Sequence, residues 1–324
     1  MSDLPTPDGP GHAPAGPAVG SPVPATVTAT GRGIRRFSLL PPAHGRANRT
    51  ARKTPSRAGR NLPAAIAVGL ALLGVLIVGL LFSPLLFTGF VAAFVVVGVN
   101  EFARAMAFRQ VLLPRVPIAL GAAVLPFAAY LGGPEVLTLA WVGACLLAVL
   151  WRALDPRPGA PAAAQAGVLA LTWIPLMVSF AVLLLRTEAG ALKLITMLLL
   201  VVANDTFGYI VGVLFGRHAM APRVSPKKTW EGFGGSIAGA AVIGVLCATL
   251  LLGRAWWVGP IMAVATVGAA TLGDLAESMI KREVGIKDMG TILPGHGGVM
   301  DRLDSIVLAA PVAFLMFELL MPQL

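Results

Sequence analysis

Long apolar runs recur along the chain from residue 64 onward, each about the 17 to 25 residues that a helix needs to cross a bilayer. We predict nine transmembrane helices, at residues 64–82, 86–104, 113–131, 136–151, 166–185, 194–215, 235–252, 256–273 and 304–321. The third and fourth runs lie close together and the fourth is short, so this pair is also compatible with a re-entrant hairpin. The pattern indicates an all-α, polytopic integral membrane protein with about nine transmembrane helices.

The segment that precedes the first run has a different character. Residues 1–62 are rich in Pro and Gly, and their apolar residues follow no helical or strand period. Nine Lys and Arg residues lie between Arg32 and Arg60, whereas the only acids of the segment are Asp3 and Asp8. We predict a disordered, basic cytoplasmic tail over residues 1–62, attracted to an anionic leaflet, followed by one transmembrane domain over residues 63–324.

The composition excludes a soluble protein. Apolar residues make up 56% of the chain and charged residues only 12%, with a mean hydropathy of +0.81, so too few polar groups exist to cover a water-facing surface. The net charge is +10, and with this hydropathy an anionic lipid is a better partner than a nucleic acid. Cys145 and Cys247 lie inside apolar runs, which is typical of buried hydrophobic residues rather than of a disulfide or a zinc site.

The distribution of basic residues predicts the topology. If the N-terminus is cytoplasmic and nine helices alternate, 22 of the 25 Lys and Arg residues fall on the cytoplasmic side. The three on the other side are Arg186, Lys193 and Arg254. Cytoplasmic loops are enriched in Lys and Arg, so this bias supports nine helices with the N-terminus inside.

Two loops on the predicted cytoplasmic side, residues 216–234 and 274–304, hold most of the remaining polar residues. In the first loop Lys227 and Lys228 lie beside Ser225, Thr229 and Glu231. This grouping suits a phosphate site, but it is also compatible with a helix cap at Ser225 or Thr229 and with lysines that only anchor the loop at the membrane surface.

The second loop has a more specific pattern. Asp274, Ser278 and Lys281 are spaced i, i+4 and i+7, which places them on one helix face if the eighth helix continues through them, and Glu277 borders that face. Farther along, the glycines of Pro294–Gly298 surround His296 and allow the backbone to approach an anion closely.

Four acids in this loop, Asp274, Asp288, Asp301 and Asp304, lie among lysines and arginines. This is the composition of a site that holds magnesium and a polyphosphate. Asp301 and Asp304 also stand where a helix begins, a position that favours acids for capping alone, although capping needs one of them at most.

Two further acids lie in apolar runs. Asp205, next to Asn204, is in the middle of the sixth run, where an ionised carboxylate costs roughly 2.5 to 3.5 kcal/mol, so it is a candidate functional residue; structural pairing with another helix is the alternative. Glu101 is a weaker candidate, because it ends the second run and is compatible with a place at the interface beside Arg104.

The second loop resembles the signature of the phosphatidate cytidylyltransferases, the CDP-diacylglycerol synthases. The matching residues are Ser278, Ile280, Lys281, Arg282, Lys287, Asp288, Gly290, Leu293, Pro294, His296, Gly297, Gly298, Asp301, Arg302, Leu303 and Asp304. The upstream stretch is also similar to that family, at Asn204-Asp205, Gly208-Tyr209, Gly216-Arg217 and the run from Ser225 to Gly232. The resemblance covers about residues 64–324 and does not reach the tail.

The resemblance implies transfer of CMP from CTP to phosphatidic acid, dependent on magnesium, with a second cation left open, in a membrane-embedded homodimer that binds no nucleic acid. It implies a plasma-membrane enzyme whose active site faces the cytoplasm. The expected catalytic residues are Asp301, Lys281, Arg302, Lys228 and Asp205, and the expected metal ligands are Asp301, Asp274, Asp304 and Asp205. The expected substrate-binding residues are Ser225, Lys227, Thr229, Ser278, Arg282, Lys287, His296, Gly297 and Gly298, although His296 has an equally good role in fixing the glycine turn.

The same residues suggest two alternative functions. An enzyme that uses CTP on another lipid phosphate fits the two loops equally well, since nothing in the first five runs identifies the lipid. A secondary transporter would distribute polar residues along several helices and would show a repeat between its halves, but here the charge is concentrated in two loops on one side.

Overall fold

Helices make up most of the described chain. The structure, a computed structural model, describes residues 74, 77–80, 82–293 and 297–321. Its helices are α2 (Pro84–Ala107), α3 (Arg115–Leu154), α4 (Ala160–Leu171), α5 (Met177–Leu184), α6 (Gly190–Phe215), α7 (Trp230–Leu246), α8 (Val258–Val284) and α9 (Met300–Leu320). Two π-helical segments, η1 (Thr172–Leu176) and η2 (Cys247–Leu251), join α4 to α5 and extend α7. The predicted tail and most of the first predicted span lie outside the described residues.

Seven of these stretches are long and apolar enough to cross a bilayer: α2, α3, Ala160–Leu184, α6, Trp230–Leu251, α8 and α9. They coincide with the predicted spans from the second to the ninth, and the prediction of a helical integral membrane protein is therefore confirmed. Large apolar side chains such as Leu139 and Leu250 are more than 70% exposed, as expected for helix faces that meet lipid. The count of nine and the cytoplasmic N-terminus stay predictions.

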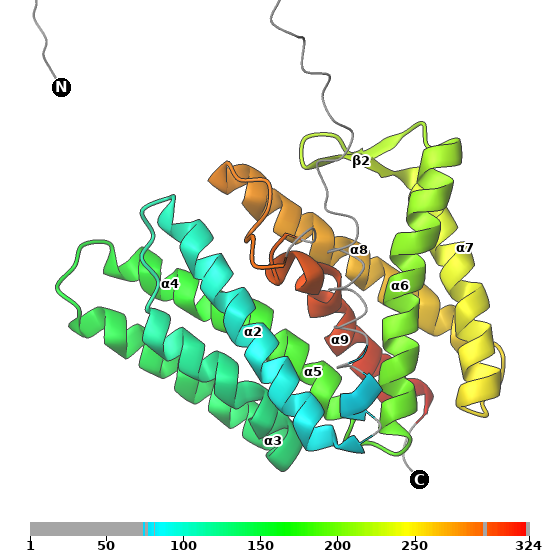
Figure 1. Cartoon of the computed structure of the whole chain (residues 1–324), viewed down its shortest axis with the longest axis horizontal. Helices are drawn as coiled ribbons and strands as arrows, with labels where there is room; N and C mark the ends of the chain where they lie inside the picture. The colour runs from blue at the N-terminus through cyan, green and yellow to red at the C-terminus, as the bar shows by residue number, and fades with distance from the viewer. Residues whose placement is uncertain (1–73, 75–76, 81, 294–296, 322–324) are drawn as a thin grey trace, which may run out of the picture. The chain divides into compact units, whose positions relative to one another are not determined.

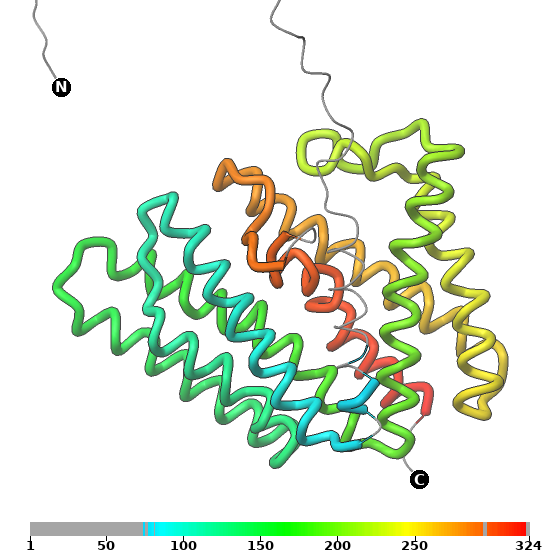
Figure 2. Tube along the Cα trace, viewed as in Figure 1, coloured from blue at the N-terminus to red at the C-terminus, as the bar shows by residue number. Residues whose placement is uncertain are grey.

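Helix α3 accounts for two of the predicted spans because it folds back on itself. Gly133 has φ 76° and ψ −165°, a non-helical conformation that glycine adopts readily, and Pro134 disfavours a helical residue before it. A Cβ built on Gly121 would lie 3.0 Å from the Cβ of Ala144, although a straight helix would separate these residues by roughly 35 Å. The halves of α3 therefore run antiparallel (Figure 2).

The helices that follow α5 build the region of interest. Helix α6 packs against α7, and α8 packs against both α7 and α9 (Figure 1). On the other side, α2 packs against α3 and α9, and its Phe102 is fully buried near Trp173. Helix α9 therefore lies between two groups of helices, and residues from distant parts of the chain meet at its N-terminus.

A short β-hairpin, which the all-α prediction misses, connects α6 to α7. Strands β1 (Ala219–Ala221) and β2 (Ser225–Thr229) pair antiparallel. Ser225 thus belongs to a strand rather than to a helix cap, while Thr229 does cap α7, because its hydroxyl accepts a hydrogen bond of 3.1 Å from the N–H of Gly232. The seventh span begins at Trp230, five residues before the predicted start at 235. Strands this short leave no alternation that a sequence pattern could reveal.

Candidate active site

A polar cavity of about 270 Å³ lies between α6, α7, α8 and the β-hairpin. Among the residues that line it, Asp205, Lys227, Lys228, Thr229 and Asp274 are predicted site residues. They come from both polar loops and from the sixth apolar run. The structure therefore brings together three segments that the sequence separates by up to about 70 residues.

Asn204 of α6, next to Asp205, forms hydrogen bonds to both α7 and α8. Its backbone carbonyl accepts a hydrogen bond of 2.7 Å from Ser236 of α7, and its side-chain oxygen accepts one of 3.3 Å from Thr271 of α8. Its amide nitrogen donates to Asp205 at 3.0 Å. Asn204 is 6% exposed, so its bonds to Ser236 and Thr271 form away from water, and its amide then helps to orient the Asp205 carboxylate.

Asp274 joins the two loops. Lys228 of β2 lies 2.6 Å from one carboxylate oxygen of Asp274, and Ser278 donates a hydrogen bond of 3.2 Å to the other. Asp205, Asp274 and Lys228 all line the same cavity. Since α8 continues to Val284, the predicted face of Asp274, Ser278 and Lys281 exists, and its first two members are in direct contact.

The next turn of α8 carries a buried ion cluster. The Nζ of Lys281 lies 3.0 Å from Glu277, one turn earlier, and 2.9 Å from Asp301 at the start of α9. The side chains of Glu277 and Asp301 are 0% and 6% exposed, and that of Lys281 is 13% exposed. One oxygen of Glu277 has no partner among the described residues. The cluster therefore holds one more carboxylate than its single lysine can neutralise.

Asp301 also organises the glycine-rich loop that leads into α9. Its carboxylate accepts hydrogen bonds from the backbone N–H groups of Met289, at 3.1 Å, and Gly298, at 2.8 Å. Gly297 adopts φ 82° and accepts a hydrogen bond of 3.0 Å from the N–H of Leu293. Both oxygens of Asp301 are thus engaged by this chain. Residues 294–296, and with them the predicted role of His296, lie outside the described residues.

Glu101 is the site residue that sequence reasoning underestimated. It is 1% exposed in α2, and it accepts a hydrogen bond of 2.9 Å from the N–H of Met300 at the start of α9. A Cβ added to Gly290 or to Gly298 would lie 2.0 Å or 2.5 Å from its carboxylate. The glycines of the loop therefore make room for the Glu101 side chain. The only sign of Glu101 in the sequence is that it is an acid at the end of an apolar run.

The remaining predicted site residues lie outside the cavity lining and outside the ion cluster of Glu277, Lys281 and Asp301. Arg282 donates a hydrogen bond of 3.2 Å to the carbonyl of Val224, which ties the end of α8 to the β-hairpin. Asp304 is half-buried near Asp274 and accepts a hydrogen bond from the N–H of Ser305. Lys287 and Arg302 are exposed, and Ser225 is half-buried but does not line the cavity. These positions provide no further test of the predicted roles.

The donor set fits magnesium only in combination with a substrate. Within the described part of the chain, no three Asp, Glu, His or Cys side chains are arranged to hold a metal ion. Magnesium is usually bound by one or two carboxylates together with substrate phosphates and water. Asp205 and Asp274 line the cavity and are two such carboxylates. The oxygens of Asp274, like those of Asp301, already have partners on this chain, so either acid would have to exchange a partner to bind a metal ion.

Comparisons with known proteins identify the family of the chain. Residues 63–320 match the model of the cytidylyltransferase family. The chain is 41% identical over 298 residues to the phosphatidate cytidylyltransferase of Mycobacterium leprae, covering 86% of this chain and 95% of the relative. It is 39% identical over 292 residues to the one of Mycobacterium bovis, with the same coverage. With the enzyme of that name from Brucella abortus it shares 40% identity over 126 residues, which is 39% of this chain and 47% of the relative.

Proposed function

The chain belongs to the cytidylyltransferase family, and on that premise we propose that it transfers CMP from CTP to phosphatidic acid, giving CDP-diacylglycerol and pyrophosphate. The observation that carries the proposal is the cavity where Lys227 and Lys228 meet Asp205 and Asp274. Because helices of membrane length build this cavity, a polyphosphate from water and a phosphate on a lipid can both reach it.

In the proposed reaction, an oxygen of the lipid phosphate attacks the α-phosphorus of CTP in line. A new P–O bond forms while the bond from the α-phosphorus to its bridging oxygen breaks, and pyrophosphate leaves with the electron pair. The attacking phosphate is already an anion, so the reaction needs neither a strong general base nor a covalent enzyme intermediate. The main barrier is repulsion between two anions, and the protein lowers it by positioning the reactants and compensating their charge.

The lysines of β2 and α8 have different parts in this proposal. Lys227 is exposed at the cavity and has no ion pair within the described residues, so its charge is available to a phosphate. Lys228 and Lys281 are held by acids, which fixes their ammonium groups before a substrate arrives. We assign the lipid phosphate and the triphosphate to these lysines together with Arg282, Lys287 and Arg302, and we assign Asp301 and Glu101 to holding the glycine loop in place.

Magnesium, when bound, would offset the charge of the triphosphate and polarise the α-phosphate. Asp205 and Asp274 are the proposed ligands, with Asp304 beside them. The proposal also includes a plasma-membrane location with the active site facing the cytoplasm, supported by the bias of Lys and Arg toward that side, and a homodimer, for which the family resemblance is the only support.

The test supplies purified protein with labelled CTP, phosphatidic acid and magnesium, and measures labelled lipid and pyrophosphate. We expect a CDP-lipid to form, and chelation of magnesium with EDTA to stop its formation. Other lipid phosphates are offered in parallel, because a better alternative substrate would reassign the lipid. If folded protein forms no CDP-lipid from any of them, the proposed function is wrong.

Two matched variants test whether Lys228 takes part in the reaction. Lys228→Met removes the cation that faces Asp274, and we expect turnover to fall at least tenfold. Arg254→Gln changes an exposed arginine between η2 and α8, away from the cavity, and should leave turnover unchanged. Equal turnover in both variants would remove Lys228 from the mechanism.

A further inference from the structure

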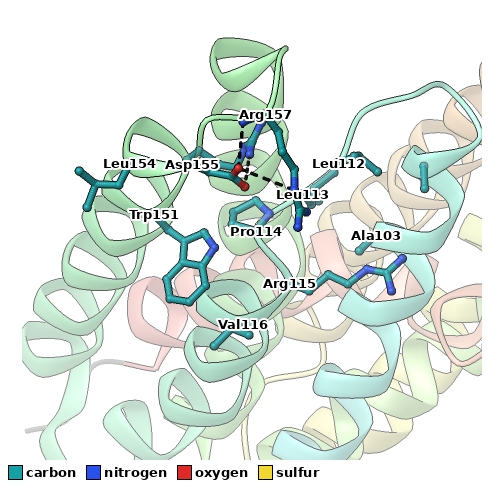
Figure 3. A pocket seen from close by; sticks show the side chains of 12 residues that line it. Ala103, Leu112, Leu113, Pro114, Arg115, Val116, Trp151, Leu154, Asp155 and Arg157 are labelled. Atoms are coloured by element: carbon teal, nitrogen blue, oxygen red, sulfur yellow. Dashed lines mark hydrogen bonds and ion pairs between the residues drawn. The ribbon is translucent and has the colours of Figure 1, made fainter.

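A second cavity, of about 700 Å³, lies at the ends of α2 and α3. It shares no lining residue with the candidate active site. Its walls come from the end of α2, the connection to α3, the start of α3 and the turn that follows Leu154. Figure 3 shows Trp151 and Arg115 on either side of this space, with Asp155 and Arg157 beside it.

The charged residues of this cavity favour an anion. Three arginines, Arg115, Arg152 and Arg157, line it together with a single acid, Asp155. Arg152 and Arg157 both pair with that acid, at 2.5 Å and 3.7 Å. The backbone N–H of Arg157 and these two arginines hold the pKa of Asp155 below its usual range, so the acid stays ionised. Arg115 has no ion pair within the described residues, and the cavity keeps an excess of positive charge.

The start of α3 lacks the groups that would balance its positive charge. Arg152 is only 2% exposed, and its guanidinium already donates to Asp155 at 2.5 Å and to the carbonyl of Pro158 at 3.4 Å, so it contributes positive charge to the wall of the cavity. Helix α3 begins here with no side-chain cap and with no acid in its first turn, and it carries Arg115 there instead. A basic residue at an uncapped helix N-terminus is unfavourable unless an anion offsets both the arginine and the helix dipole.

The apolar residues of the cavity indicate that this anion belongs to a lipid. Leu112, Val116, Trp151 and Leu154 line the same space and are 47% to 76% exposed. They lie at the ends of helices of membrane length, where acyl chains meet head groups. A soluble phosphate would gain nothing from such a rim, whereas a phospholipid can place its phosphate on the arginines and its glycerol and first methylenes on the rim.

We propose that this cavity is a binding site for the head group of an anionic glycerophospholipid, separate from the site of cytidylyl transfer and independent of the proposed function. Arg115 and the backbone N–H groups at the start of α3 bind the phosphate, and the charges of Arg152 and Arg157 favour its presence. The predicted topology places this end on the cytoplasmic side, where anionic lipids attract basic groups.

The test measures lipid retention by the purified full chain, using native mass spectrometry in detergent. Phosphatidylglycerol serves as the probe, because it is anionic and lacks the phosphate monoester of phosphatidic acid. Phosphatidylcholine, inorganic phosphate and CTP are the comparison ligands. We expect phosphatidylglycerol to bind at least fivefold more tightly than phosphatidylcholine, and neither soluble anion to displace it.

Matched variants locate the binding. Arg115→Gln should weaken phosphatidylglycerol binding about fivefold, since one basic group near a membrane surface contributes about 1 kcal/mol. Arg254→Gln, at an exposed arginine outside the cavity, should not change it. Equal binding of the two lipids by the unaltered protein, or an equal loss in both variants, overturns the proposal. Displacement by inorganic phosphate would show a soluble-anion site and would overturn the assignment to lipid.

Discussion

Removing the charge of Lys281 should destabilise the protein as well as inactivate it. In Lys281→Met the side chain keeps nearly its length but loses the ammonium group that lies 3.0 Å from Glu277 and 2.9 Å from Asp301. Two carboxylates with exposed fractions of 0% and 6% then face each other without a cation. Breaking a buried ion pair by removing one partner costs roughly 3 to 5 kcal/mol, a large share of the 5 to 15 kcal/mol that typically stabilises a folded protein.

The assay follows thermal unfolding of the purified variant in detergent and, separately, its turnover. We expect a clear fall in the unfolding midpoint and loss of activity. A second variant, Glu277→Gln with Lys281→Met, removes one of the two isolated carboxylates, so it should regain part of the lost stability without regaining turnover. This difference distinguishes an electrostatic role in folding from a role in the reaction.

The exposed Lys287 provides the matched control for stability. It has no ion pair among the described residues, so Lys287→Met should unfold at the same temperature as the unaltered protein. If Lys281→Met also unfolds at that temperature, other groups compensate the charges of Glu277 and Asp301 in that variant. The reasoning from burial would then be refuted.

Other predictions concern the glycine loop and the tail. Glu101→Ala leaves the buried N–H of Met300 without an acceptor and should lower the free energy of unfolding by roughly 1 to 3 kcal/mol. Glu101→Gln keeps an acceptor and should be about as stable as the unaltered protein. Equal losses of stability in denaturant unfolding would contradict this. Gly290→Ala puts a Cβ within 2.0 Å of Glu101 and should abolish turnover, while Gly268→Ala, with no atom within 4 Å, should have little effect; similar turnover in both would contradict the close packing. Deleting residues 2–60 should leave turnover in detergent nearly intact, and a large loss would show a catalytic role for the tail.

The helices could be predicted because each apolar run is a local property of the sequence. The predicted spans and the described helices agree to within a few residues at most ends, since about twenty apolar residues have few alternatives to a helix in a bilayer. The prediction missed the β-hairpin at Ala219–Thr229, and it left open whether the eighth helix continues past its predicted span, which ends at 273; α8 does continue, to Val284. Both points concern polar segments, where hydropathy carries no information about whether the backbone continues as a helix.

The candidate site could be predicted only where a local sequence pattern distinguishes its residues. Asp205 is conspicuous because it is an acid in an apolar run, and Lys281 because it belongs to a helical repeat of polar residues. Glu101 is different, because its significance depends on contact with Met300, which is 199 residues away. No local pattern reports a contact across that separation, so its role emerges only when α2 and α9 are seen together.

One face of α8 connects the parts of the site. Asp274 faces the lysine of β2, and about two helical turns later Lys281 binds the acid that begins α9. Asp301 in turn holds the glycine loop, into which Glu101 projects from α2. Asp274 and Lys281 thus both have partners on other segments, so one substitution on α8 displaces groups on several others. For this reason we expect the effects of substitutions at Asp274, Lys281 and Asp301 to be strongly non-additive, and double-mutant cycles are needed to apportion them.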